Sequence, residues 1–231
     1  MSRKVVYTIP GWGFSANILN CGALANTPCL GLDYINYSNM SVEGIALVLS
    51  KTIKKSSVIV AWSMGGLFAI KIANLFPGKV KKLVLLASQP RFIADIRYSG
   101  IHPKVMNNFI DAANQNFFGL KQQFIDKVNL PITNNPCRGS VQPYFLDNFS
   151  EQLKSLLSLL AMTDLRDEYC HLKVEILHII GGKDAVLKQD ETSLRSINDN
   201  IKVVHIEDAG HGGFLTHVLL YRSAMDKFIE F

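Results

Sequence analysis

The sequence predicts a single α/β domain built on a mostly parallel central sheet. Short runs rich in Val, Ile and Leu, apolar throughout, alternate along the chain with segments of helical spacing. Such runs are typical of strands in a parallel sheet that helices cover on both faces. A chain of 231 residues, 48% hydrophobic and 19% charged, has enough apolar material for one core of ordinary size.

The expected elements of this core follow from local pattern. Residues 41–53 begin with a serine and an early acid, which is typical of a capped helix N-terminus. The segment 64–76 has a helical apolar face, and 217–231 has the pattern of a closing helix. The five expected strands are residues 5–9, 58–61, 83–88, 174–180 and 202–207.

Residues 91–170 interrupt the alternation. They contain no convincing strand, and helical patterns occupy 103–113, 119–128 and 149–163. We therefore expect residues 1–90 and 171–231 to form the α/β core, with 91–170 inserted in it as a helical lid.

Charge and composition exclude several function classes. The net charge of +5 is concentrated in KTIKK (51–55) and GKVKK (78–82), a pattern typical of solvated helix ends. No aromatic residues are interleaved with these lysines as nucleic-acid stacking would require, so no nucleic-acid partner is expected. The sequence has neither an apolar N-terminal run typical of a signal peptide nor a stretch that could span a membrane, so no membrane association is expected.

The four cysteines show no C-x-x-C pair and no metal-type spacing. We interpret them as free thiols in a reducing compartment, the cytoplasm. A bridge between Cys21 and Cys29 is the alternative.

The stretch VIVAWSMGG (58–66) places Ser63 between a buried strand and a helix. A serine in this position, with small residues two before and two after it, is typical of a nucleophile elbow. The turn is so tight that larger flanking side chains would collide with the strand and the helix. Gly65 meets this requirement fully, whereas Ala61 adds one methyl group where the usual pattern has glycine. A plain strand–turn–helix with a capping serine is the alternative.

A serine nucleophile of this type needs an acid and then a histidine farther along the chain. Asp184 follows a predicted strand in IIGGKDAV, and among the six histidines His211 follows the last predicted strand in DAGHGGF. Asp190 and Asp208 are rival acids. Ser63, Asp184 and His211 thus occur in the required order, each at a strand's carboxyl end, where open α/β sheets build their sites. They are the predicted catalytic triad.

Two backbone N–H groups are expected to bind the oxyanion of such a reaction. The Met64 N–H lies at the start of the helix after the elbow. The second donor should come from the loop after the first strand, PGWG (10–13), where the N–H of Trp12 is the candidate. Packing in the core is the alternative role for Trp12.

Several of these segments together resemble the α/β-hydrolases, and more narrowly the pimeloyl-acyl-carrier-protein methyl ester carboxylesterases of biotin synthesis. The similarity spans nearly the whole chain. The triad segments are shared by many hydrolases, whereas GIHPKVMNNF and the DLR of MTDLRDEY are narrower. The segments that carry the resemblance are PGWG (10–13), AWSMGG (61–66), LVLLASQPRF (83–92), GIHPKVMNNF (100–109), MTDLRDEY (162–169), GGKDAVL (181–187) and DAGHGGF (208–214).

The resemblance implies an α/β-hydrolase fold and hydrolysis of a carrier-bound acyl methyl ester, with no cofactor and no metal. It assigns the triad to Ser63, Asp184 and His211, the oxyanion hole to Trp12 and Met64, and substrate contacts to Trp12 and Phe124. Four features depart from the family pattern. They are Pro10 in place of a histidine, Ala61 in place of a glycine, no hairpin before the first strand, and an arginine-rich lid face that is only partly reproduced.

The implied partner is an acyl carrier protein, which is strongly acidic. Residues 91–138 carry six Lys or Arg against three Asp, and a cationic lid of this kind would face the carrier. Ordinary solvated helix faces are the alternative. The residues expected to contact the carrier are Lys121, Lys127 and Arg138.

Two other functions remain open on the sequence. One is a broad short-chain esterase or thioesterase that acts on free small substrates. The other is a binding protein of hydrolase fold whose triad is vestigial.

Overall fold

The computed structural model describes residues 5–54, 56–131 and 141–229. Within these residues, six strands form one sheet in the order β2-β1-β3-β4-β5-β6, and every neighbouring pair is parallel. The predicted α/β class with a parallel central sheet is therefore confirmed. The strands are β1 (Val6–Ile9), β2 (Cys29–Gly31), β3 (Ser57–Trp62), β4 (Val80–Leu86), β5 (Glu175–Gly181) and β6 (Ile201–Ile206).

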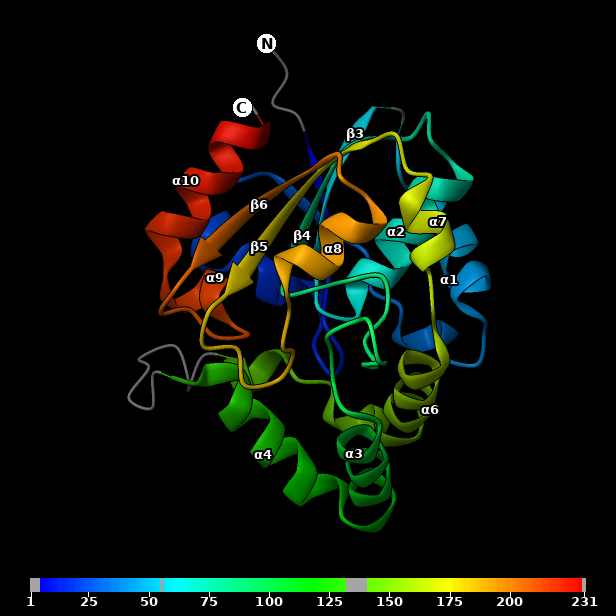
Figure 1. Ribbon diagram of the computed structural model, residues 1–231. Coiled ribbons are helices and arrows are strands. Elements are labelled where there is room, and N and C mark those ends of the chain that lie inside the picture. Colours follow the sequence, from blue (N-terminus) through cyan, green and yellow to red (C-terminus); the bar gives the residue numbers. More distant parts are fainter. Residues whose placement is uncertain (1–4, 55, 132–140, 230–231) are drawn as a thin grey trace.

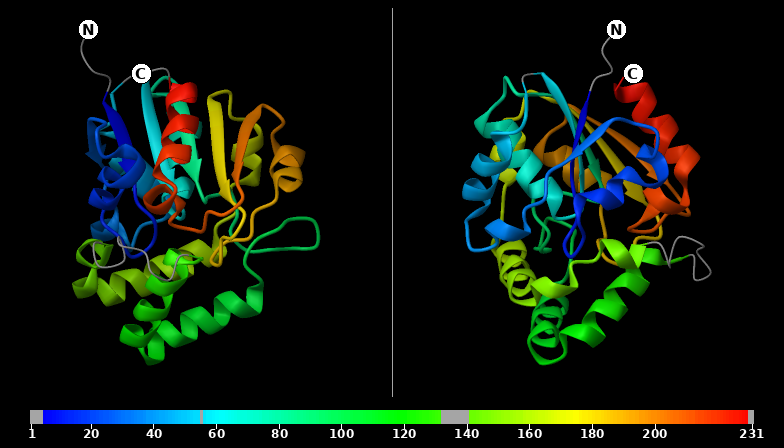
Figure 2. Two further views of the ribbon diagram at one scale, coloured as in Figure 1. Left: turned by 90° about the vertical axis from the view of Figure 1, so that its left-hand side faces the viewer. Right: turned by 180° about the vertical axis from the view of Figure 1, so that it is seen from behind.

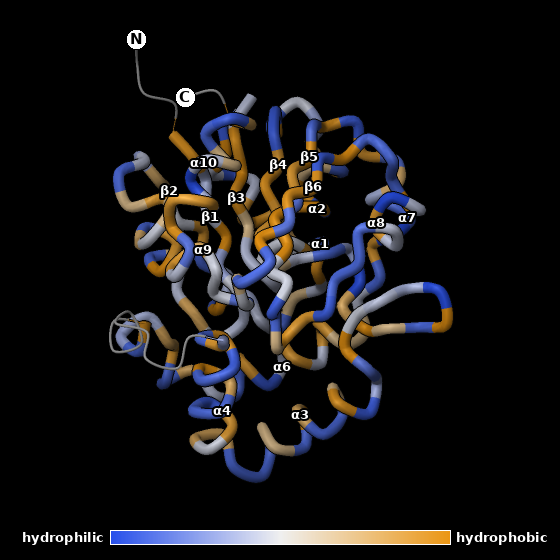
Figure 3. Tube along the Cα trace, turned by 60° about the vertical axis from the view of Figure 1, so that its left-hand side comes forward, coloured by the Kyte–Doolittle hydropathy of each residue, from blue (hydrophilic) through white to orange (hydrophobic). Residues whose placement is uncertain are grey.

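The centre of the sheet is apolar on both faces. All residues of β1 and β3 are buried, which explains why these segments lack the alternation of a half-exposed strand. Figure 3 shows the hydrophobic residues concentrated along the strands and the hydrophilic ones on the outer loops. Parallel strands point their carboxyl ends at one edge of the sheet, so the loops after β1, β3, β5 and β6 meet there.

Helices cover both faces of the sheet, as the strand pattern requires. On one face α1 (Val42–Ser50), α2 (Gly65–Leu75) and α7 (Arg166–Cys170) pack in succession, with α8 (Glu191–Ile197) against α7. On the opposite face lie α9 (Gly213–Thr216) and α10 (Val218–Ile229), as Figures 1 and 2 show. The side chain of Ser41 accepts a hydrogen bond from the N–H of Gly44 and caps α1, as expected from the sequence.

Between β4 and β5 the chain forms α3 (Pro103–Gln115), α4 (Phe117–Asn129) and α6 (Ser150–Met162). These three helices, called the cap helices below, lie beyond the carboxyl ends of the strands (Figure 1). Asn116 caps α4 by accepting a hydrogen bond from the N–H of Gly119. The cap helices follow the predicted helical stretches to within two residues at each end.

Three details of the core differ from expectation. Strand β2 was not predicted, and its three residues are partly or fully exposed. Strand β4 begins at Val80, three residues before the predicted start at 83. Its early part includes Lys82, which is buried because its ammonium donates to the carbonyl of Phe228 (2.6 Å). The strand ends at Leu86, because Ala87 has a left-handed φ of +45°.

Cys21 and Cys29 are both free thiols, so the alternative of a bridge between them is wrong. Within the described part of the chain, none of the helices has the length and apolar character needed to cross a bilayer.

Candidate active site

Ser63 lies at the sharp turn between β3 and α2, with a left-handed φ of +52°. A residue with a Cβ adopts this conformation only when its surroundings hold it there. A Cβ on Gly65 would come within 2.5 Å of the carbonyl oxygens of both Ile9 and Pro10, so glycine is required at 65. Ala61, in contrast, is fully buried within β3, and the strand pairs there in regular register with Ile9 of β1 and Leu85 of β4. The steric requirement of the elbow is therefore strict on the helix side.

Ser63, His211 and Asp184 form one chain of hydrogen bonds. The hydroxyl of Ser63 donates to Nε2 of His211 over 3.0 Å, and Nδ1 of His211 donates to Oδ2 of Asp184 over 2.8 Å. The other carboxylate oxygen of Asp184 accepts from the N–H groups of Val186 (2.8 Å) and Leu187 (2.9 Å). The side chains of His211 and Asp184 are 0% and 3% exposed, so the hydrogen bond between them is shielded from water.

The rival acids lie elsewhere. Asp208 is exposed and forms an ion pair with Lys183 at 2.6 Å. Asp190 caps α8 by accepting a hydrogen bond from the N–H of Ser193. Both carboxylates have pKa values below their usual range, because Ser193 donates to Asp190 and Lys183 donates to Asp208. Asp184 alone of the three acids contacts His211.

The loop that carries His211 is held from two sides. The indole N–H of Trp62 donates to the carbonyl of His211 over 3.0 Å, and the N–H of Gly212 donates to the carbonyl of Val128 in α4 over 3.0 Å. A Cβ on Gly210 would overlap the carbonyl oxygen of Leu130. Gly210 and Gly212 thus leave room for the end of α4, which lies directly on this loop.

The residues of the two predicted oxyanion donors both lie close to Ser63. Met64 immediately follows Ser63 at the start of α2, and Trp12 lies in the loop after β1 and lines the same pocket as Ser63. Neither backbone N–H has a hydrogen-bond acceptor among the described residues. The indole of Trp12 is used differently, donating to the carbonyl of Leu153 in α6 over 2.8 Å.

A pocket opens over Ser63 between the sheet edge and the cap helices. Phe124, predicted as a substrate contact, lines it and packs edge-on against Trp12 with ring centroids 5.0 Å apart. Among the described residues that line the pocket, all except Ser63 and Lys127 are apolar. Those not predicted to lie there are Phe92, Ile101, Val105, Met106, Phe109, Leu157, Leu160, Ala185 and Val186.

The three cations expected to contact a carrier have different positions. Lys127 is exposed and lines the pocket. Lys121 does not lie on the surface: its side chain is 7% exposed, forms an ion pair with Asp147, and lies over the ring of Phe145. Assigning Lys121 to a carrier-facing surface was therefore wrong, because its ammonium is buried and pairs with Asp147 of the same protein. Arg138 lies outside the described residues.

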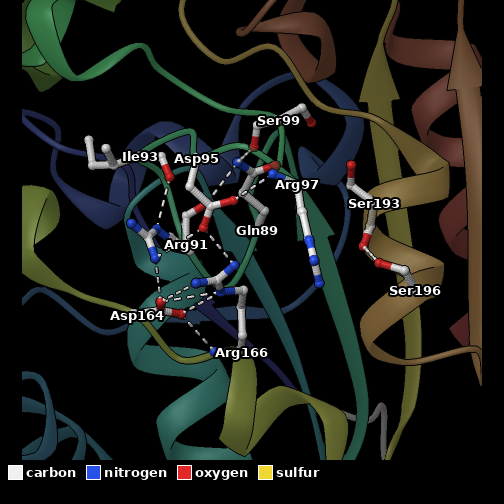
Figure 4. Close-up of polar contacts among 10 residues, drawn as sticks. All are labelled: Gln89, Arg91, Ile93, Asp95, Arg97, Ser99, Asp164, Arg166, Ser193 and Ser196. Atoms are coloured by element: carbon white, nitrogen blue, oxygen red, sulfur yellow. Dashed lines mark hydrogen bonds and ion pairs between the residues drawn. The ribbon is translucent and has the colours of Figure 1, made fainter.

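The DLR segment fastens the region that carries the cap helices. Arg166 and Arg91 both bind the carboxylate of Asp164, and Arg166 also binds Asp95 at 2.9 Å (Figure 4). Burial alone would raise the pKa of Asp164, but the hydrogen bonds and charge of Arg166 and a hydrogen bond from Arg91 together hold that pKa below its usual value. The network joins the segment that follows β4 to the segment that follows α6.

In the described part of the chain, no group of three or more His, Cys, Asp or Glu side chains is arranged to hold a metal ion. The chemistry that the arrangement offers is that of a serine made nucleophilic by a histidine, beside an apolar pocket.

Comparisons with known proteins agree with this geometry. The model of a family described as the alpha/beta hydrolase family matches residues 3–229. A pimeloyl-[acyl-carrier protein] methyl ester esterase of Wigglesworthia glossinidia brevipalpis is 26% identical over 240 residues, which cover 96% of this chain and 92% of that protein. One of the same name from Vibrio vulnificus (strain CMCP6) is 29% identical over 189 residues, 80% of this chain and 67% of that protein.

Solved structures show the same fold at lower identity. An esterase from Exiguobacterium antarcticum superposes with a TM-score of 0.85 at 19% identity, covering 99% of this chain and 92% of the other. A bromoperoxidase from Bacillus anthracis gives 0.83 at 15% identity, covering 100% and 93%.

Proposed function

Because the chain belongs to the alpha/beta hydrolase family, we propose that it is a serine carboxylesterase. Its substrate is the methyl ester of an acyl chain carried by an acyl carrier protein, and the step is pimeloyl-carrier methyl ester to pimeloyl-carrier and methanol, in biotin synthesis. The observation that carries the proposal is the hydrogen-bonded Ser63–His211–Asp184 chain beside a pocket whose described lining, apart from Ser63 and Lys127, is apolar. The free thiols of Cys21 and Cys29 suit the cytoplasm as its location.

The reaction proceeds through an acyl-enzyme. Ser63 Oγ attacks the ester carbonyl while His211 Nε2 takes its proton, and Asp184 orients the imidazole and stabilises the imidazolium. The N–H groups of Trp12 and Met64 hold the oxyanion of the tetrahedral intermediate. His211 returns the proton to the departing methoxide, and methanol leaves. Water activated by His211 then releases the acid and restores Ser63.

The pocket supports an aliphatic acyl chain as the substrate class. Its wall has the rings of Trp12, Phe109 and Phe124 and side chains of the cap helices, which suit methylene groups. The names of the related pimeloyl-carrier methyl ester esterases support pimeloyl as the acyl group. The matches to these relatives cover most of this sequence.

The function is tested by comparing kcat/KM for two methyl esters and a thioester. We expect a higher kcat/KM for the carrier-bound pimeloyl methyl ester than for methyl butyrate or a short-chain thioester. A similar kcat/KM for all three substrates would contradict the carrier-dependent function and favour a general esterase. Turnover of none of them by correctly folded protein would contradict the esterase itself.

Carrier docking involves the exposed cation at the pocket. Among the described residues that line the pocket, Lys127 is the cation placed to meet an acidic carrier as the acyl chain enters. A charge at the rim of an interface mainly speeds association and is screened by salt. Lys127→Glu should lower kcat/KM for the carrier-bound ester several-fold at low salt and less at about 0.3 M salt.

The same variant should turn over methyl butyrate like the wild type. Lys51→Glu is the matched control, because Lys51 is exposed at the end of α1, before β3 begins, and so lies away from the pocket. Equal kcat/KM values for Lys127→Glu and Lys51→Glu on the carrier-bound ester would exclude Lys127 from docking.

A further inference from the structure

The loop after β4 passes beneath the nucleophile and contacts its backbone directly. Ser88 is fully buried, and its hydroxyl donates to the carbonyl oxygen of Ser63 over 2.7 Å. The N–H of Ser63 donates to the carbonyl of Leu86 over 2.9 Å. Both backbone polar groups of Ser63 are thus held by the end of β4 and the loop that follows it.

This contact is built at some conformational cost. Ser63 and Ala87 are both non-glycine residues with left-handed φ angles, +52° and +45°. Residues in this region persist only where surrounding contacts hold them. Ala87 turns the chain between the end of β4 and Ser88, and Ser88 in turn holds the carbonyl of the strained Ser63.

The second glycine of the elbow is explained by the same contact. A Cβ on Gly66 would overlap Ser88 Oγ and come within 2.8 Å of Ser88 Cβ. Gly65 makes room for the loop after β1, whereas Gly66 makes room for Ser88. The two glycines of SMGG therefore have separate functions.

Ser88 also connects the elbow to the loop that carries the acid. The side-chain amide of Gln189 donates to the carbonyl of Ser88 over 2.7 Å. Gln189 follows Asp184 in the loop after β5, where the N–H groups of Val186 and Leu187 bind the carboxylate of Asp184. A line of hydrogen bonds thus runs from Ser63 through Ser88 to Gln189, beside the one through His211.

We propose that Ser88 is a positioning residue, which fixes the elbow and the acid loop relative to each other so that Ser63 Oγ stays aligned with His211. The inference rests on the proposed role of Ser63 as the nucleophile. Small displacements of reacting groups cost large factors in rate. The carbonyl of Ser63 also accepts from the N–H of Gly66 over 3.0 Å, so it keeps a partner when the Ser88 hydroxyl is removed.

The test compares Ser88→Ala with Ser57→Ala. Ser57 is also buried, and its hydroxyl also donates to a backbone carbonyl, that of Lys54 (2.7 Å), but at the start of β3. On enzyme titrated for active sites, Ser88→Ala should lower kcat for methyl butyrate by on the order of 10- to 100-fold with KM nearly unchanged. Ser57→Ala should leave both constants within about twofold of the wild type.

A purely structural role for Ser88 predicts a different result. Both variants would then lose thermal stability alike and keep the wild-type kcat for each titrated site, which would overturn the proposal. Ser88→Cys keeps the shape and a weak donor, so its kcat should fall between those of the wild type and Ser88→Ala.

Two further variants keep the proposal testable if Ser88→Ala does not fold. Gln189→Met leaves Ser88 in place and removes only the donor to its carbonyl, so kcat should fall with KM unchanged. Gly66→Ala should displace the Ser88 side chain and cost less kcat in the Ser88→Ala background than in the wild type. Wild-type kcat for Gln189→Met, or additive losses for Gly66→Ala, would overturn the proposal.

The failure of this inference is distinguishable from that of the proposed function. If Ser63→Ala retains turnover, Ser63 is not the nucleophile and the proposed function fails. If Ser63→Ala is inactive while Ser88→Ala behaves like Ser57→Ala, only the positioning role of Ser88 fails.

Discussion

Ser63 Oγ and His211 Nε2 lie 3.0 Å apart, although 148 positions separate the two residues in the chain. The parallel sheet brings them together, because Ser63 follows β3 and His211 follows β6, and both strands end at the same edge of the sheet. The cap helices then cover this edge of the sheet. Their apolar side chains, among them Phe124 and Leu157, line the pocket that contains Ser63.

Replacing the acid tests whether Asp184 orients the imidazole. Asp184→Asn removes the acceptor for His211 Nδ1–H and favours the wrong tautomer, so kcat should fall by up to about 10⁴-fold. Asp208→Asn is the control, because Asp208 is exposed and paired with Lys183, and its kcat should stay near that of the wild type. A greater loss of kcat for Asp208→Asn than for Asp184→Asn would overturn the assignment.

The two small residues of the elbow should respond differently to substitution. Gly65→Ala places a Cβ within 2.5 Å of two carbonyl oxygens, so the free energy of unfolding should fall by about 1–3 kcal/mol and turnover should drop. Ala61→Gly should lower the free energy of unfolding by only about 0.5–1 kcal/mol and keep turnover. Urea unfolding measures the free energy of unfolding of each variant, and an ester assay measures its turnover. Wild-type behaviour of Gly65→Ala would contradict the steric account of the elbow.

A buried histidine should make stability depend on pH. Burial lowers the pKa of His178 to about 4, and its Nε2 accepts a hydrogen bond from the hydroxyl of Tyr169 over 2.7 Å. In the unfolded chain a histidine has a pKa of about 6.5. As the pH falls, the unfolded state therefore binds a proton first, and stability is lost between about pH 6.5 and 4. The contribution between pH 7 and pH 5 is about 2 kcal/mol.

This loss is measured by urea unfolding at the two pH values. His178→Gln should lose about 2 kcal/mol less than the wild type between pH 7 and pH 5. His205→Gln is the control, because His205 is exposed with a side chain 46% accessible, and it should keep the dependence that His178 causes. The same pH dependence in His178→Gln and the wild type would contradict this account.

Much of the fold was predictable because the core strands contain runs of apolar residues and the helices have clear apolar spacing. Strand β2 was not, since its three residues are exposed or half-buried at the sheet edge and carry no pattern. The end of β4 was misplaced because Ala87 leaves the strand through a left-handed turn. Ala87 has no feature in the sequence that marks this turn.

The site was predictable where chain order and strand ends specify it. Asp184 was preferred over Asp190 and Asp208 by its position directly after a buried strand, and it is the acid that contacts His211. Contacts between distant segments were not predictable. The inward direction of Lys121 depends on Asp147 and Phe145, and the position of Ser88 beneath the elbow depends on how β3 and β4 end side by side.

The residues of the pocket wall were predictable in part. Val105, Met106 and Phe109 have the spacing of one helix face, so α3 itself was predictable. Which side of α3 faces Ser63 depends on how the cap helices lie on the sheet edge. Charge and periodicity within the segment do not specify that placement.

The central claim is that Ser63 attacks the ester, and methanol release from the carrier-bound pimeloyl methyl ester tests it most directly. The wild type should release methanol in proportion to active sites labelled by a fluorophosphonate. Ser63→Ala should take no label and release no methanol above background, with a kcat lower by on the order of 10⁶, while its urea unfolding midpoint stays close to that of the wild type. Methanol release by folded Ser63→Ala at a rate near that of the wild type would contradict the account.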